Sequence, residues 1–128
     1  MAEAIAPADA EALLVAHLAA VLAVPVATRV PNPRPPSMVR LSLADTTRQT
    51  AAHFYSRLIV ECWAPTEPAA AALARTAYAH TVALEGEDAG ADWVGDVVEV
   101  GGPANFPEPE VGPRYQFTVD LLISGELI

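Results

Sequence analysis

The stretch from Tyr55 to Glu85 constrains the fold most, because its hydrophobic period changes partway along. Over residues 55–64 bulky side chains alternate between two sides, which is typical of a strand. Thr66 then offers an N-cap, and Pro68 is tolerated in a first helical turn. Small and apolar residues follow at helical spacing up to residue 85. The stretch predicts a long strand, a tight corner and a helix folded back on one face of that strand. The face expected to meet the helix carries Leu58, Val60, Cys62 and Ala64.

The same two patterns organise the rest of the chain. A helix is expected over residues 9–24, with Asp9 as its N-cap, and a helix over 67–85 follows the long strand. Alternating residues predict the other strands, at 26–30, 38–44, 94–100 and 114–123. The inward side chains of the last three are expected to be Val39, Leu41, Leu43, Val94, Val98, Val100, Phe117, Val119 and Leu121.

These elements predict an α+β fold in the order α-β-β-β-α-β-β. A mixed, mostly antiparallel β-sheet carries two helices packed on one of its faces. The 128 residues fit a single domain spanning 1–128, with a short loose N-terminus at residues 1–7. Three connections are expected to be exposed: a proline-rich arm at 31–36, a hairpin loop at 45–53 and a long loop at 101–113.

The composition narrows the classes of partner. The formal net charge is −9, and all seven basic residues are arginine. An acidic chain is poorly suited to gripping nucleic acid through its phosphates, so no specific binding of DNA is expected. Uninterrupted apolar runs are too short to cross a bilayer, and the N-terminus lacks a basic secretory signal, so no membrane contact is expected.

The face of the sheet that the helices leave open carries an unusual mixture of arginine, acidic and aromatic residues. One interpretation is a solvated face with cross-strand ion pairs. The other is an interface with a partner, because interface cores are enriched in aromatic residues and arginine. Arg34 in the proline arm suits either solubility or a bidentate contact to a partner's carboxylate. We favour the interface, with candidate contacts at Arg34, Arg40, Arg48, Arg57, Glu61, Trp63, Phe106, Arg114 and Asp120.

Catalytic patterns are weak by comparison. Cys62 with one of the histidines at 17, 53 or 80 is the best thiol candidate, but it lies on the predicted buried face. The histidines lack metal-ligand spacing, and Gly101-Gly102 lacks the lysine and helix of a phosphate loop. We therefore expect no catalytic residue, no cofactor and no metal, and we do not expect an enzyme.

Three phrases carry a resemblance to a known family: TRVPNPRPP, RLIVECWAPTEPAAAALA and GGPANFPEPEVGPRYQFTVDLLISG. They resemble tail terminator proteins of long-tailed, siphovirus-type bacteriophages, particularly those of actinobacteria. The resemblance covers residues 9–125 and implies a structural virion protein that closes into a homohexameric ring. Such a ring caps the head-proximal end of the tail tube, stops tail polymerisation and offers a docking surface to the head and neck.

The resemblance also implies partners and a location. The partners would be other copies of the chain, the tail tube protein and a connector protein of the head and neck, with genomic DNA passing through unbound. The protein would reside in the virion at the tail–neck junction, and in the host cytoplasm during assembly. Two alternatives stay open: another neck ring, such as a head-closure or connector protein, and a small monomeric enzyme or ligand-binding domain.

Overall fold

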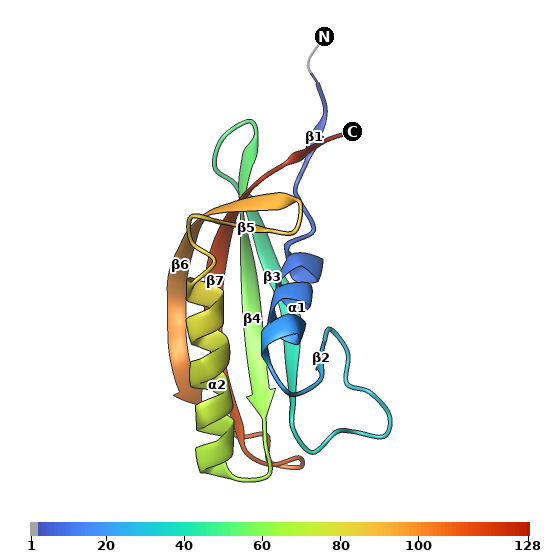
Figure 1. Ribbon diagram of the computed structural model, residues 1–128, viewed down its shortest axis with the longest axis vertical. Coiled ribbons are helices and arrows are strands. Elements are labelled where there is room, and N and C mark those ends of the chain that lie inside the picture. Colours follow the sequence, from blue (N-terminus) through green and yellow to red (C-terminus); the bar gives the residue numbers. More distant parts are fainter. Residues whose placement is uncertain (1–2) are drawn as a thin grey trace.

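The computed structural model describes residues 3–128 and confirms the α+β class. The elements follow one another as shown in Figure 1, with two helices and a six-stranded sheet beside a small two-stranded one. Their bounds are β1 (Ile5–Ala6), α1 (Ala10–Val21), β2 (Val26–Ala27), β3 (Met38–Arg48), β4 (His53–Trp63), α2 (Glu67–Val82), β5 (Glu87–Ala89), β6 (Asp92–Asn105), β7 (Arg114–Ser124) and β8 (Glu126–Leu127).

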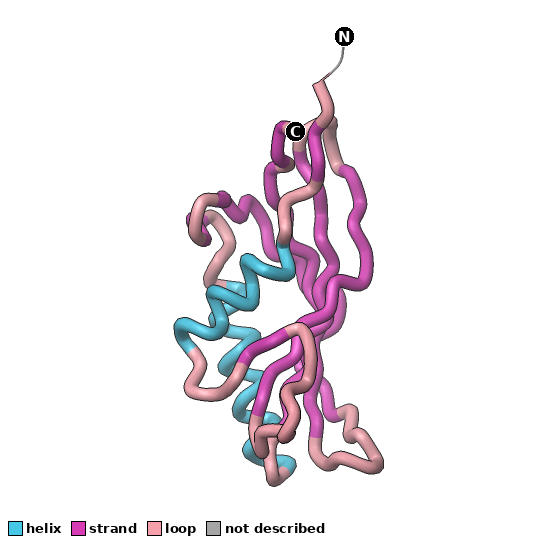
Figure 2. Tube along the Cα trace, turned by 90° about the vertical axis from the view of Figure 1, so that its right-hand side faces the viewer, coloured by secondary structure: helices cyan, strands magenta, loops and turns pink. Residues whose placement is uncertain are grey.

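The main sheet has the order β2-β3-β4-β7-β6-β5. All its pairings are antiparallel except that of β2 with β3. Both helices lie on the same side of the sheet, as Figure 2 shows, with α1 against β3 and α2 against β4, β6 and β7. The opposite face is therefore open to loops, solvent or partners.

Short elements cover only part of each outer edge of this sheet. On one side β2 pairs with residues 39–40 of β3, and the Glu11 carboxylate accepts the Leu43 N–H at 2.8 Å. On the other side β5 pairs with residues 92–94 of β6, and the Glu85 carboxylate accepts the Val97 N–H at 3.0 Å. The occupied parts are thus the first half of β3 and the first half of β6.

Both helices begin at the predicted caps. The Asp9 carboxylate accepts the Ala12 N–H at 3.0 Å, and the Thr66 hydroxyl accepts the Ala69 N–H at 3.3 Å. Each bond satisfies a backbone donor that the first helical turn leaves free. Both helices end about one turn earlier than predicted, and Leu22 is already extended where the chain turns towards Pro25.

The core lies between the helices and the sheet, as the alternation predicts. Leu58 and Val60 of β4 are fully buried, as are Val119 and Leu121 of β7. Phe117 is 1% exposed, and its ring meets the edge of the Tyr78 ring from α2 at a centroid distance of 5.4 Å. Small residues of α2 let that helix approach the sheet closely: Ala70, Ala74 and Ala77 are fully buried.

The predicted hairpin loop at 45–53 is wrong over most of its length. Strand β3 continues to Arg48 and β4 begins at His53, because β-branched Thr46 and Thr47 pair with Ser56 and Tyr55. Leu43 was predicted to point into the core but is 47% exposed. The register shifts between Leu43 and Asp45, and the strand beyond this bulge extends past the helices.

The predicted long loop at 101–113 is also wrong over its first five residues, since β6 runs on to Asn105. Its register shifts three times, and an edge strand tolerates glycine and proline at such bulges. The first shift, between Val94 and Asp96, places Val98 opposite Asp120 on the open face. Val94 is buried as predicted, whereas Val98 and Val100 are exposed.

Three short strands were not predicted. Strand β5 lies in the expected acidic connection, and β1 pairs with β8 through Ile5 opposite Leu127 and Ala6 opposite Glu126. The prediction of a loose N-terminus over 1–7 is therefore wrong at residues 5 and 6, while residues 1–2 lie outside the described part. Strand β2 is also shorter than the predicted 26–30. Within residues 3–128 no helix is long and apolar enough to span a bilayer.

Candidate partner-binding surface

Six of the nine candidate contact residues meet at one end of the open face, together with Glu108. Strand pairing places Arg40 directly opposite Glu61 and Arg114 directly opposite Trp63. The proline arm and the loop after β6 add the remaining side chains. We call this group the arginine–tryptophan cluster; its members are Arg34, Arg40, Glu61, Trp63, Phe106, Glu108 and Arg114.

Glu61 lies at the centre of this cluster and joins two arginines. Its Oε1 accepts Arg40 Nε at 2.9 Å and Nη2 at 2.7 Å, while its Oε2 accepts Arg114 Nη1 at 2.9 Å. The Glu61 side chain is 8% exposed. A carboxylate can be buried in this way because both of its oxygens receive charged donors.

Trp63 provides the platform on which the arginines lie. The guanidinium carbons of Arg34, Arg40 and Arg114 are 4.7, 5.9 and 5.7 Å from the centre of its ring, within the range of cation–π attraction. Trp63 is only 4% exposed, and its indole Nε1–H has no hydrogen-bond acceptor within the described chain. Arg34 and Arg40, whose side chains are 32% and 37% exposed, therefore form the outer surface in place of the indole.

Arg114 ties the cluster to the loop that follows β6. Its Nε donates to the Phe106 carbonyl at 2.8 Å, and its guanidinium lies 5.0 Å from the centre of the Phe106 ring. Phe106 is 56% exposed. The loop thus holds an exposed aromatic ring next to the arginines.

The cluster has the opposite charge to the rest of the protein. Three arginines against two glutamates give the cluster a net charge of +1. Because the whole chain carries −9, the residues outside the cluster carry −10. Arg34 is its least neutralised member, because its nearest carboxylate is Glu108 at 3.9 Å and its side chain is 32% exposed. The positive charge at this end of the sheet attracts anions locally.

The other three candidate residues lie elsewhere. Arg57 and Asp120 lie opposite each other further along the sheet and form a bidentate ion pair. Arg57 Nε donates to Asp120 Oδ1 at 3.0 Å, and Nη2 donates to Oδ2 at 3.1 Å. Arg48 ends β3 at the hairpin, whereas Trp63 pairs with Met38 at the other end of that strand. The Arg57–Asp120 and Arg40–Glu61 contacts are also the cross-strand pairs that the solvated-face interpretation predicts.

A small pocket adjoins the cluster and was not predicted from the sequence. It has a volume of about 270 Å³, and Arg34 and Trp63 line it together with apolar residues. The only signal for it in the sequence is the density of proline in three separate segments. The other lining residues are Pro35, Pro36, Ala64, Pro65, Val111 and Pro113. We call it the proline pocket.

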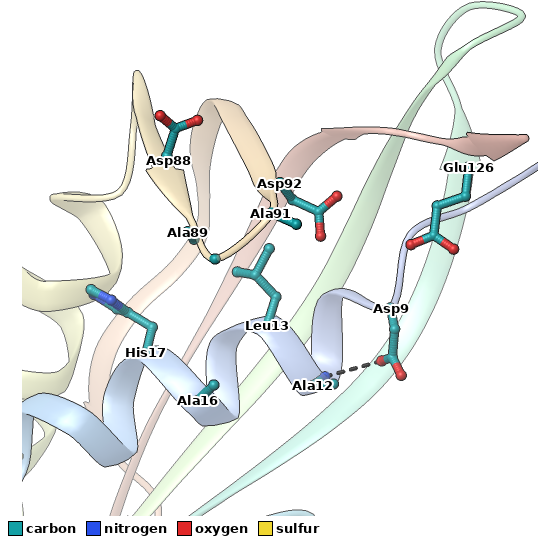
Figure 3. A pocket seen from close by; sticks show the side chains of 11 residues that line it. Asp9, Ala12, Leu13, Ala16, His17, Asp88, Ala89, Ala91, Asp92 and Glu126 are labelled. Carbon is teal, nitrogen blue, oxygen red and sulfur yellow. Dashed lines mark hydrogen bonds between the residues drawn. The ribbon is translucent and has the colours of Figure 1, made fainter.

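A larger acidic groove of about 510 Å³ lies near the opposite end, between α1, the β5–β6 turn and β8. Figure 3 shows Asp88, Asp92 and Glu126 around it, with Leu13 below them and Asp9 turned towards Ala12. Among the residues that the structure describes, no three His, Cys, Asp or Glu side chains are grouped to hold a metal ion.

Cys62 is expected to be unreactive in the folded protein. Burial, and secondarily the neighbouring Glu61 charge, raise the pKa of its thiol to about 12, so the reactive thiolate is scarce at neutral pH. Ellman's reagent at pH 8 should leave the native thiol unmodified and modify it fully in 6 M guanidinium chloride. Rapid modification of the native protein would contradict the burial of Cys62.

Comparison with models of known protein families finds no match, and a search of curated proteins finds no similar sequence either.

Proposed function

We propose that this protein is a structural virion protein of a long-tailed bacteriophage. Copies of it form a ring, of six subunits as the resemblance implies, that caps the head-proximal end of the tail tube. The ring stops tail polymerisation and provides the docking surface for the head and neck. The observation that supports the proposal best is the arginine–tryptophan cluster, because it is a preassembled, partly exposed surface that suits binding rather than chemistry.

The cluster has the features of a surface that docks without large rearrangement. Its three arginines lie on a buried indole, and Glu61 holds two of them, Arg40 and Arg114, so little side-chain freedom remains to be lost on binding. The arm at 31–36 contains four prolines, which restrict its backbone before it meets a partner. Binding energy is then less offset by ordering costs.

The charge distribution fits the proposed position in the virion. Genomic DNA would pass through the ring on its way to the tail. A subunit with a net charge of −9 repels phosphate and releases few counterions on contact, so the DNA would not adhere. The local positive charge of the cluster would instead meet protein carboxylates.

Reversing two charges is expected to abolish capping without unfolding the protein. Arg34→Glu with Arg48→Glu alters the arm and the β3–β4 hairpin, where both side chains are largely outside the core. In a phage that supplies only this variant, electron microscopy should show unattached tails of variable, excessive length beside filled heads. A control for charge reversal elsewhere on the surface is Arg75→Glu, an exposed residue of α2, which changes the net charge by half as much.

The outcome separates this function from its nearest alternative. Circular dichroism should show that the double variant keeps the wild-type fold, so that defective tails report on docking. Tails of normal length that fail to join heads would instead indicate a head-closure or connector ring. Normal tails already joined to heads would refute the proposal.

A further inference from the structure

We propose that the proline pocket binds a carboxylate side chain of a second copy of this chain, with Arg34 as its main donor. This inference rests on the proposed ring, and it names the chemistry of one contact between neighbouring subunits. It concerns the pocket of about 270 Å³ that lies between the arm, the end of β4 and the loop before β7.

The walls of the pocket are stiff and mainly apolar. Four of its eight lining residues are prolines, which come from the arm, from the corner after β4 and from the residue before β7. Such walls lose little conformational freedom when a side chain enters.

Arg34 still has donors to offer. It lies 4.7 Å from the centre of the Trp63 ring, which fixes its position without using its N–H groups. Its contact with Glu108 is 3.9 Å, which is longer than a hydrogen bond. By contrast, Arg40 and Arg114 are both engaged by Glu61.

Trp63 forms part of the pocket wall and holds Arg34 in place above its ring. Trp63 is only 4% exposed, and its Nε1–H has no acceptor within the described chain. A buried donor without a partner is unusual and carries an energetic penalty. The Nε1 atom is itself covered, so an incoming carboxylate would meet Arg34, whose guanidinium can donate to both of its oxygens.

The charge balance favours a second copy as the source of the carboxylate. Outside the cluster the chain carries −10, so two copies repel each other over most orientations. The cluster, with its charge of +1, is the place where a carboxylate of the next copy is attracted. A contact between two different surfaces of identical subunits is head-to-tail, and it closes into a ring when the rotation permits.

The test is self-association measured by sedimentation velocity over a concentration series at low salt. The Arg34→Glu variant should raise the dissociation constant about tenfold or more, because it places like charges together. The control Arg75→Glu changes the net charge equally outside the pocket and should stay within about twofold of wild type.

Two results would overturn the inference: a wild-type protein that stays monomeric at every concentration, or an Arg34→Glu variant that associates as the wild type does. Circular dichroism of each variant ensures that a loss of association is not a loss of fold.

The phage assay distinguishes this inference from the proposed function. If Arg34→Glu still associates but tails lose length control, the inference alone fails; if it dissociates but tails are normal, the proposed function alone fails.

Discussion

Replacing Glu61 with glutamine is expected to lower the free energy of unfolding by about 3 kcal/mol, because breaking a buried ion pair leaves a charge uncompensated. Glu61 holds Arg114, whose side chain is 11% exposed, and Arg40 through charged hydrogen bonds. A neutral amide offers one acceptor in place of two negative oxygens. Urea denaturation monitored by circular dichroism measures the loss.

The chain provides a matched control for this prediction. Asp120→Asn breaks the other cross-strand ion pair, in which the Arg57 side chain is 42% exposed. That change is expected to lower the free energy of unfolding by less than about 1 kcal/mol, since solvent and salt screen an exposed ion pair. Equal losses for the two variants would show that burial does not distinguish Glu61.

Replacing Phe117 with alanine is expected to lower the free energy of unfolding by about 3–5 kcal/mol, the range for removing a buried aromatic side chain. Phe117 is 1% exposed in the middle of β7, directly opposite Val60, and it packs against the Tyr78 ring. Removing it leaves a cavity that the rigid sheet and α2 cannot readily fill. A two-state protein of this size should show a clear fall in its denaturation midpoint.

The control is an exposed phenylalanine. Phe106→Ala removes a ring that is 56% exposed and lies against Arg114 at the surface. Its expected cost is less than about 1 kcal/mol, because little apolar area returns to water. A Phe117→Ala variant as stable as Phe106→Ala would contradict the core described above.

The parts of the fold that the sequence predicts are those governed by local pattern. The alternation around Leu58 and Val60 fixes which face of β4 is buried, and Asp9 and Thr66 mark the helix starts through bonds to residues three positions on. The register of β6 was not predictable in this way. A bulge such as that between Val94 and Asp96 depends on the partner strand, which the local sequence does not reveal.

The candidate surface shows the same division. Alternation correctly placed Arg40, Glu61, Trp63 and Arg114 on one face of the sheet. It did not predict that Glu61 and Trp63 are covered within the chain, because the covering side chains come from other strands and loops distant in sequence. Their role as partner contacts stays a prediction, and it would act through the arginines that they hold.

The half-covered edges of the sheet have a consequence for fibre formation. Through β4 and β7, residue 39 of β3 lies level with residue 105 of β6, and residue 48 lies level with residue 94. If two copies lay side by side without an offset, the covered first half of β3 in one copy would face the uncovered second half of β6 in the next. The uncovered second half of β3 would likewise face the covered first half of β6. Uncontrolled growth of a continuous intermolecular sheet, the route to amyloid-like deposits, is thus obstructed by geometry in a chain that has no lysine to guard its edges.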